Sequence, residues 1–259
     1  MGLRRLFSII MMNERGIDYA ITKKRRALSG SLSERMNHTV KYGPFKKMKF
    51  AKKSRWWASG SNGGMLLGVY EKEVLDALMK VPNKYDIFID LGAADGYYSI
   101  GTLVSKKFRI GYSFEISAKG RESILKNATL NRVKKKIHIF GEAKKDFYLN
   151  IPKNDLKKSV ILIDIEGAEF SILDKNTLSN LKNSIIFIEL HEWFFDDGEK
   201  KLNKLKSDAK NFFKISELKT SSRDFSVFPE LSLFNDSERW LIASEGRGRL
   251  MTWLRLDPI

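Results

Sequence analysis

The sequence predicts an α/β fold built around a mostly parallel sheet with helices on both faces. Short apolar runs, such as IFID at residues 87–90 and ILID at residues 161–164, recur along the chain, and segments with apolar residues at helical spacing separate them. Strands that are apolar on both faces are typical of parallel sheets buried between two helical layers.

The predicted elements alternate from residue 69 onward. Helices are expected where apolar residues recur about every three or four positions, namely at residues 69–79, 97–105, 118–131 and 198–210. Strands are expected at residues 85–92, 108–116, 136–141, 159–165 and 184–190, with two further candidates at residues 212–218 and 239–245. Ligands of such sheets bind beyond the carboxyl ends of the strands, so the residues just after each strand are the first candidates for a site.

Composition limits the classes of chemistry that the chain can perform. With 259 residues, 42% of them hydrophobic, the chain can bury a sizeable core. It contains no cysteine, which excludes disulfides, cysteine–zinc sites and thiol nucleophiles, and this agrees with a reducing compartment.

The net charge of +16 is concentrated near the N-terminus. Residues 1–57 hold 15 Lys and Arg against 3 Asp and Glu, whereas residues 58–259 hold 32 against 28. We therefore expect a basic N-terminal extension at residues 1–57 and a second domain at residues 58–259, joined near the loop sequence SGSNGG. The extension is expected either to attract phosphates, an anionic membrane face or an acidic glycan, or to be a solvated basic arm.

The first residues are not expected to cross a membrane. The apolar run at residues 6–12 is far shorter than the roughly 20 residues that span a bilayer, and no signal-peptide cleavage motif follows it. We expect a cytoplasmic protein, with a short amphipathic helix available for peripheral contact with a membrane.

The turn after the first predicted strand, DLGAADG, has the character of a nucleotide-binding turn. Gly92 allows a sharp bend and Gly96 stands where a helix begins. Glu115 ends the second predicted strand, 25 residues beyond Asp90, and an acid at this offset can accept both ribose hydroxyls. Together the two segments indicate a cofactor that carries a nucleoside.

The acids in this turn indicate which cofactor. Asp90 and Asp95 are poor neighbours for a pyrophosphate, which prefers bare amides at a helix N-terminus. They suit a cofactor with a cationic amino-acid end, namely S-adenosylmethionine. Glu142, with the backbone of residues 141–143 after the third strand, then provides a polar edge for the adenine amine.

At this point the sequence resembles a known family. FIDLGAADGYYSIG, FEIS, ILIDIEGAEFSIL and IIFIELHEW are similar to the motifs of FkbM-type S-adenosylmethionine-dependent methyltransferases, over roughly residues 42–245 and most strongly over residues 85–193. The resemblance implies a Rossmann-like, seven-stranded sheet of the class I methyltransferase type and methyl transfer to hydroxyl groups, often of sugars or natural products. The sequence departs from the family pattern at Ala94, where a polar residue is expected. The candidate cofactor-binding residues are Asp90, Gly92, Ala93, Asp95, Gly96, Glu115, Ile116, Glu142, Ala143 and Asp164.

The block IDIEGAE places three carboxylates within six residues. Asp164 ends the fourth predicted strand, and Glu189 and His191, which end the fifth, point to the same face because they are two residues apart. Two mechanisms are open for these three candidate catalytic residues. Either Asp164, Glu189 and His191 hold Mg²⁺, as some relatives use a divalent metal, or His191 is the general base and Asp164 orients it.

The remaining polar residues near these strand ends have simpler interpretations. Glu169 falls in the first turn of a predicted helix, where the helix dipole favours a carboxylate, so a structural role is expected. Glu166 is expected either to bind substrate or to accept hydrogen bonds from loop amides. Arg247 and Arg249 either contact an anionic acceptor or lie on the surface of a terminal hairpin.

The resemblance implies an O-methyltransferase that acts on a hydroxyl of a saccharide or glycan precursor. The acceptor is expected to be a small molecule or a glycan, and the basic extension is expected either to hold an acidic acceptor or to contact a membrane. The alternative is a nucleic-acid 2′-O-methyltransferase whose basic arm holds the phosphate backbone. Methylation of a base is disfavoured, because the fourth strand is followed by DIEGAE and not by a prolyl-aromatic loop.

Overall fold

The computed structural model describes residues 3–52 and 62–259. The predicted boundary between residues 57 and 58 lies outside these ranges, so the division into two domains stays a prediction.

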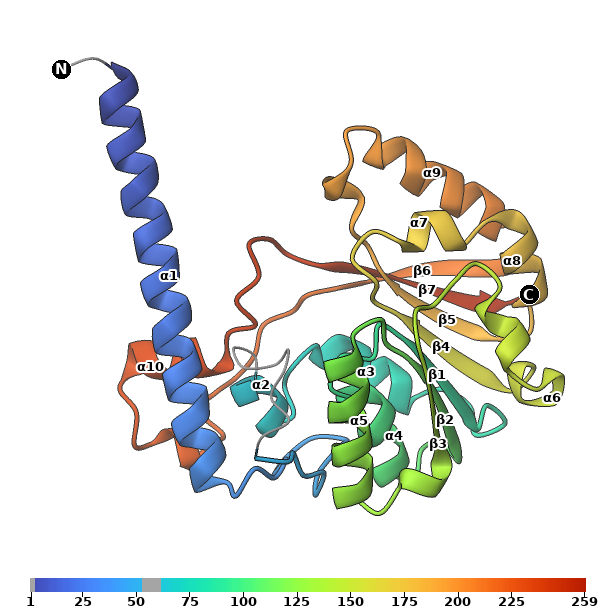
Figure 1. Cartoon of the computed structure of the whole chain (residues 1–259), viewed down its shortest axis with the longest axis horizontal. Coiled ribbons are helices and arrows are strands. Elements are labelled where there is room, and N and C mark those ends of the chain that lie inside the picture. Colours follow the sequence, from blue (N-terminus) through green and yellow to red (C-terminus); the bar gives the residue numbers. More distant parts are fainter. Residues whose placement is uncertain (1–2, 53–61) are drawn as a thin grey trace.

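A seven-stranded sheet forms the centre of the molecule, in the order β3-β2-β1-β4-β5-β7-β6 (Figure 1). Strands β1 to β5 run parallel, and β7 runs antiparallel to both β5 and β6. The order reverses between β1 and β4, which places a ligand site at their carboxyl ends. The predicted Rossmann-like, mostly parallel fold is thereby confirmed. The strands are β1 (Ile87–Leu91), β2 (Ile110–Phe114), β3 (Ile137–Phe140), β4 (Ser159–Ile163), β5 (Ile185–Glu189), β6 (Phe213–Lys219) and β7 (Thr252–Pro258).

Helices cover both faces of this sheet. The α-helices are α1 (Leu3–Arg35), α2 (Asn62–Leu66), α3 (Lys72–Met79), α4 (Tyr97–Val104), α5 (Ala118–Leu130), α6 (Lys153–Leu156), α7 (Glu169–Ile172), α8 (Lys175–Asn180), α9 (Gly198–Ala209) and α10 (Asp236–Ala243). Four 3₁₀ helices in the described residues join them: η1 (Lys134–Lys136), η2 (Phe147–Asn150), η3 (Glu192–Phe194) and η4 (Pro229–Leu231).

Alternate residues of the strands supply two hydrophobic clusters, one on each face. Phe88 and Leu162 face the cluster that contains the buried side chains of α3, α4 and α5. Ile89 and Ile163 face the opposite cluster, which includes residues of α8 and α9. The central strands are therefore apolar on both sides, and this explains why each reads as a continuous apolar run.

One predicted strand is wrong. Residues 239–245 were expected to be extended, but residues 236–243 form helix α10. A capping box explains the start of this helix: the Asn235 side chain accepts from the N–H of Glu238 at 3.0 Å, and the Glu238 carboxylate accepts from the N–H of Asn235 at 3.3 Å. The seventh strand is β7, nearer the C-terminus, which pairs with β5 and β6.

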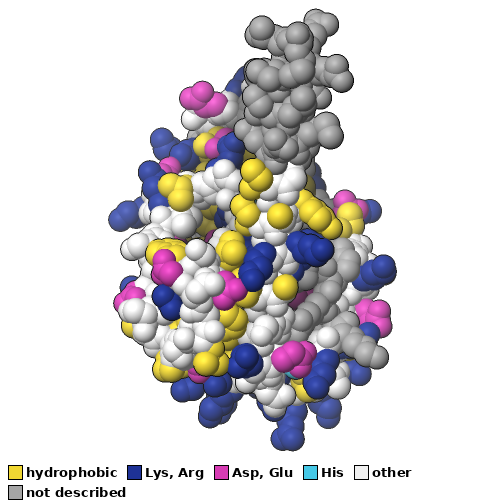
Figure 2. Space-filling view, turned by 90° about the vertical axis from the view of Figure 1, so that its left-hand side faces the viewer, with side chains coloured by type: hydrophobic (Ala, Val, Ile, Leu, Met, Phe, Trp, Pro, Cys, Tyr) yellow, Lys and Arg dark blue, Asp and Glu magenta, His cyan; other side chains and the backbone are white. Residues whose placement is uncertain are grey.

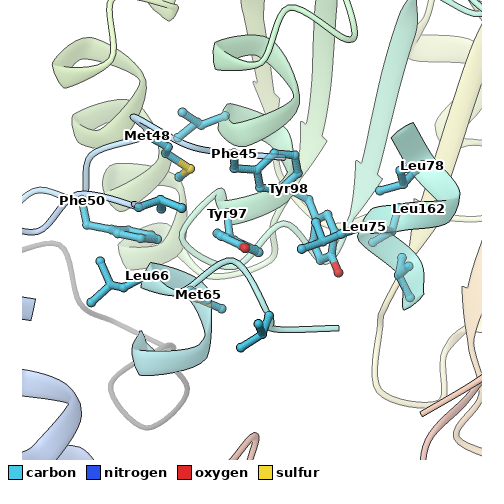
Figure 3. Packing of buried hydrophobic residues seen from close by; sticks show 14 of the residues in the cluster. Phe45, Met48, Phe50, Met65, Leu66, Leu75, Leu78, Tyr97, Tyr98 and Leu162 are labelled. Atoms are coloured by element: carbon cyan, nitrogen blue, oxygen red, sulfur yellow. The ribbon is translucent and has the colours of Figure 1, made fainter. Parts of the chain in front are cut away.

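The C-terminal half of α1 is packed against the body of the protein. Leu28, Leu32 and Met36 are buried in the same cluster as the helices α3 to α5. The segment that follows inserts Phe45, whose ring meets the Tyr97 ring edge-on at 5.1 Å between centroids (Figure 3). This part of the basic N-terminal segment therefore contributes to the core.

The other half of α1 projects from the body (Figure 1). Ile17, Tyr19 and Ile21 are exposed there. On the face that Figure 2 shows, Lys and Arg side chains are spread among hydrophobic ones, with a few acidic side chains between them. Within residues 3–52 and 62–259, none of the helices combines the length and apolar character that crossing a bilayer requires.

Candidate active site

A cavity of about 270 Å³ opens at the carboxyl ends of β1, β2 and β4. It gathers segments that lie far apart in the sequence, because parallel strands end at one edge of the sheet. All the predicted cofactor-binding residues except Gly96 line it: Asp90, Gly92, Ala93, Asp95, Glu115, Ile116, Glu142, Ala143 and Asp164. The remaining lining residues are Met65, Tyr70, Glu71, Ala94, Tyr97, Tyr98, Phe114, Leu162, Ile165, Glu166 and Ala168.

The turn after β1 is shaped by three residues with positive φ. Gly92 has φ +89°, and a Cβ there would overlap the carbonyl oxygen of Asp164, so only glycine fits. Ala94 has φ +48°, and Gly96, with φ +87°, immediately precedes α4. The backbone of this turn therefore runs close to the strand end that carries Asp164.

Glu115 is held in a fixed position beside this turn. Its Oε2 accepts from the N–H of Ala94 at 2.8 Å, and its Oε1 accepts from the N–H of Ser117 at 2.7 Å. Gly120 packs so closely that a Cβ there would lie 2.6 Å from Glu115 Cγ. Each carboxylate oxygen keeps a free lone pair at the cavity wall, which is the arrangement that a pair of ribose hydroxyls requires.

Asp90 and Asp95 are buried acids at the same end of the cavity. Ser99 Oγ donates to Asp90 Oδ2 at 2.5 Å. Burial raises the pKa of Asp90 to about 7 and that of Asp95 to about 6, although hydrogen bonds to each group oppose the rise. A cationic ligand would relieve the cost of keeping these groups ionised.

Behind Asp164 and Glu166, which line the cavity, Glu169 orients His191. The buried Glu169 carboxylate accepts from the N–H of Gly167 at 2.8 Å and from the N–H of His191 at 3.0 Å. Its Oε1 also lies 3.3 Å from His191 Nδ1. Nε2 of the imidazole is thereby directed toward the carboxylates of Asp164, Glu166 and Glu189, at 3.8, 3.6 and 3.7 Å.

The charges around His191 favour its protonated form. Burial lowers the pKa of the imidazole, but the hydrogen bond and the charge of Glu169 outweigh this effect and raise it above its usual value. Burial also raises the pKa of Asp164 and of Glu189, and because the two carboxyl groups share a hydrogen bond, the Glu189 carboxyl keeps its proton to higher pH. Oδ1 of Asp164 is buried without a hydrogen-bond partner and faces His191 Nε2.

Two features of this region could not be predicted from the sequence, namely the role of Glu71 and the ion pairs of Arg247. Glu71, buried and with φ +45° just before α3, accepts from the Tyr98 hydroxyl at 2.5 Å. Arg247 forms ion pairs with Glu71, Glu189 and Glu245. Arg247 is therefore neither a free surface residue nor a free anion ligand, because acids of the protein already surround it. No local pattern signals these pairs, since each joins segments distant in the sequence.

The candidate metal ligands are arranged differently from the predicted set. One ligand atom each of Asp164, Glu166 and His191 lies within 4.8 Å of the others. The sequence predicted Glu189 where the structure has Glu166. Oε1 of Glu189 accepts a hydrogen bond from Arg247. The chemistry of the closer set, two carboxylates and one imidazole, is compatible with a divalent cation.

Comparisons with known proteins agree with the sequence motifs. Residues 145–227, which include β4, the IDIEGAE block and His191, match the family model described as the methyltransferase FkbM domain. No curated protein matches the chain by sequence.

Solved structures with similar folds include three proteins of low sequence identity. An uncharacterized protein from Listeria monocytogenes is 11% identical with a TM-score of 0.49, and the match covers 73% of this chain and 68% of that one. A putative tRNA (m1A22) methyltransferase from Streptococcus pneumoniae, in complex with S-adenosyl-L-methionine, is 17% identical with a TM-score of 0.47 and coverage of 72% of each chain. TYW2 from M. jannaschii in complex with AdoMet is 13% identical with a TM-score of 0.43 and coverage of 80% of each chain.

Within residues 145–227 the chain therefore matches a methyltransferase, and the sheet order agrees with the fold predicted for that class. The resemblance to FkbM-type methyltransferases, predicted from IDIEGAE and the neighbouring motifs, is confirmed over residues 145–227.

Proposed function

We propose that the protein methylates a hydroxyl group of a saccharide or glycan precursor. The observation that supports this acceptor chemistry most directly is the Glu169–His191 pair: Nδ1 lies against a buried carboxylate, and Nε2 faces Asp164 and Glu166, which line the cavity. This is the arrangement of a general base that removes a proton from an alcohol.

The cavity wall offers a matching group for each part of the cofactor. We assign the ribose hydroxyls to Glu115, the adenine edge to Glu142 and Ala143, and the cationic amino-acid end to the side of the cavity that holds Asp90 and Asp95. Asp164 then stands between the donor and the acceptor. S-adenosylmethionine, when bound there, supplies a methyl group activated by its sulfonium.

The residues of the chain then perform the proton chemistry. His191 Nε2 accepts the proton of the acceptor hydroxyl while the oxygen forms its bond to the methyl carbon and the carbon–sulfur bond breaks, which leaves S-adenosylhomocysteine and a methyl ether. Glu169 stabilises the imidazolium that results. A positioned base of this kind contributes about 10²- to 10⁴-fold to the rate.

A divalent cation is the alternative means of activating the hydroxyl. Asp164, Glu166 and His191 would hold it, with Glu189 beside them, and the cation would supply Lewis-acid activation of the hydroxyl in place of a protein base. The two mechanisms differ in one measurement. Activity that persists after thorough EDTA treatment excludes the metal, whereas activity that is lost and restored by Mg²⁺ excludes His191 as the base.

A nucleic-acid 2′-hydroxyl is the competing acceptor. In the described part of the chain, the cation next to Asp164 and Glu189 is Arg247, which is already paired with three carboxylates.

We expect a cytoplasmic enzyme whose basic N-terminal segment contacts an anionic surface, either the acceptor or a membrane face.

Labelled-methyl transfer onto fractionated cell lysate tests the proposal. The wild-type protein should label glycan or saccharide fractions, and His191→Ala should reduce the rate by about 10²-fold or more while S-adenosylhomocysteine still binds. Label that appears in RNA, or a His191→Ala variant with the rate of the wild type, would contradict it.

A further inference from the structure

A second hollow of about 490 Å³ lies beside the reaction centre, and we call it the basic groove. Its walls are the segment after β6, the end of α10 and the loop between α10 and β7. This volume is within the range of small-molecule sites. The lining residues that the argument uses are Ser221, Ser222, Phe225, Trp240, Arg247 and Arg249.

The loop of residues 244–250 connects the basic groove to the reaction centre. Arg247 lines the groove and forms ion pairs with Glu71 and Glu189, of which Glu71 lines the cofactor cavity. The Arg249 guanidinium stands over the Trp193 ring at 4.5 Å, and that ring is 5.3 Å from the His191 ring. Arg249 and Trp193 therefore form a chain of contacts from the groove to His191.

An exposed aromatic ring stands in the groove wall. Trp240 is 59% exposed, yet its ring is held edge-on by Phe225 at 5.0 Å between centroids. A large aromatic face kept in place and left in water is suited to the apolar C–H face of a pyranose ring. The exposed Ser221 and Ser222 offer hydroxyl groups to the sugar hydroxyls.

Among the side chains that the structure describes, those of residues 16–52 and 63–259, two guanidinium groups near the groove have no acidic partner. Arg249 is exposed and stands over the Trp193 ring. Arg25 of α1 lies against Gly246, where a Cβ would overlap its guanidinium, and its buried Nε has no hydrogen-bond partner among the same residues. By contrast, Arg223 is paired with Glu73 and Glu245. The groove thus has positive charge available for an anion, and a guanidinium binds a carboxylate or phosphate with two hydrogen bonds.

We propose that the basic groove binds an acidic saccharide next to the reaction centre, with a sugar ring on Trp240 and its carboxylate or phosphate at Arg249 and Arg25. This inference rests on the proposed function and names its substrate class. Asp224 and Asp236, which line the adjoining hollow, carry charges that repel a continuous phosphate backbone but leave room for a single acidic group.

Calorimetric titration of the full chain tests the groove, in the presence of saturating S-adenosylhomocysteine. The probes are hexagalacturonate, a phosphorylated pentamannoside, neutral maltohexaose and a six-nucleotide RNA. We expect at least one acidic saccharide to bind about tenfold or more tightly than maltohexaose, and the two acidic probes distinguish a carboxylate from a phosphate. Arg249→Glu and Trp240→Ala should each weaken that binding about tenfold or more.

The control variants carry matched changes on distant surfaces. Lys135→Glu repeats the charge change of Arg249→Glu, and Leu149→Ala removes an apolar side chain that is 71% exposed. Both should leave saccharide affinity unchanged. The proposal would be overturned if maltohexaose bound as tightly as the acidic saccharides, or if the RNA bound more tightly than they do. It would also be overturned if no saccharide bound, or if the control variants lost as much affinity as Arg249→Glu and Trp240→Ala. Normal S-adenosylhomocysteine binding with no saccharide binding would overturn the groove alone, whereas transfer of label to RNA would overturn the proposed function as well.

Discussion

Glu169 shows how one buried carboxylate can have both a structural and a chemical consequence. The sequence predicts a structural role at the start of a helix, and the side chain indeed accepts from the N–H of Gly167. The same group accepts from the His191 backbone and lies against its ring, which the sequence does not show because 22 residues separate the two. The contact between Glu169 and His191 depends on the pairing of β4 with β5, because Glu169 follows β4 and His191 follows β5.

Replacing this carboxylate should change the pH dependence of the reaction. Glu169→Gln removes the charge that raises the pKa of His191, so the base becomes neutral, and active, at lower pH. We expect the acid limb of the kcat–pH profile to move down, and kcat at its plateau to fall about 10- to 100-fold because the imidazolium loses its partner. Steady-state kinetics between pH 5 and 9 measures both. A profile that does not move would show that Glu169 has no electrostatic effect on the base.

Asp90 is expected to reduce stability while it serves the cofactor. Its pKa rises from 3.8 to about 7 on folding, so the folded state binds the proton more tightly and the free energy of unfolding falls as pH rises between these values. Asp90→Asn should therefore increase the free energy of unfolding at pH 8 by roughly 2–4 kcal/mol and leave it nearly unchanged at pH 4.

Urea denaturation at the two pH values measures this difference. Asp76→Asn, an exposed acid paired with Lys72, is the matched control and should have a small effect at both. If Asp90→Asn changed the free energy of unfolding by the same amount at pH 8 and at pH 4, the carboxyl group would not be buried as described.

Residues that end strands are the part of the site that a sequence can predict. Asp90 lies near the end of β1, and Glu115 and Asp164 follow β2 and β4. The rule that parallel strands end at one edge brings them together. Glu71 and Arg247 escape prediction because their pairing is set by the path of the connecting loops. Their separation of 176 residues gives no periodic or local signal.

At the level of elements, the wrong prediction at residues 239–245 has a physical cause. The apolar residues Trp240, Leu241 and Ile242 are adjacent, which resembles a buried strand as much as a short helix. The capping box at Asn235 and Glu238 is the signal that decides for the helix. The segment that contains Arg247 and Arg249 was interpreted as part of a terminal hairpin. Strand β7 forms the C-terminal end of this segment, and it belongs to the central sheet because it pairs with β5.

Helix α1 gives an element-level prediction about the basic N-terminal segment. Leu32 is completely buried in the core, so Leu32→Ala should lower the free energy of unfolding by about 2–5 kcal/mol. Ile21→Ala, at a side chain that is 43% exposed on the same helix, should change it by less than about 0.5 kcal/mol. Urea denaturation of the two variants makes the comparison. Equal small effects would mean that α1 does not pack on the body in solution.

At the level of the whole molecule, four segments that are distant in the sequence meet around one group of acids. The segment before α3 contributes Glu71, the loops after β4 and β5 contribute Asp164 and His191, and the loop before β7 contributes Arg247. These ion pairs join the cofactor cavity to the basic groove. The fold therefore places the cofactor cavity and the basic groove on either side of the same group of acids.

Titration calorimetry with S-adenosylhomocysteine is the most direct test of this arrangement, because every assignment in the cavity depends on Glu115 holding the ribose. The wild-type protein should bind with a micromolar dissociation constant, and Glu115→Gln should weaken binding by about 10²-fold, since a carboxylate hydrogen-bonded to two hydroxyls is lost. Glu122→Gln, at an exposed glutamate of α5, is the matched control and should bind as the wild type does. Absence of binding by the wild-type protein, or equal affinities of wild type and Glu115→Gln, would contradict the account.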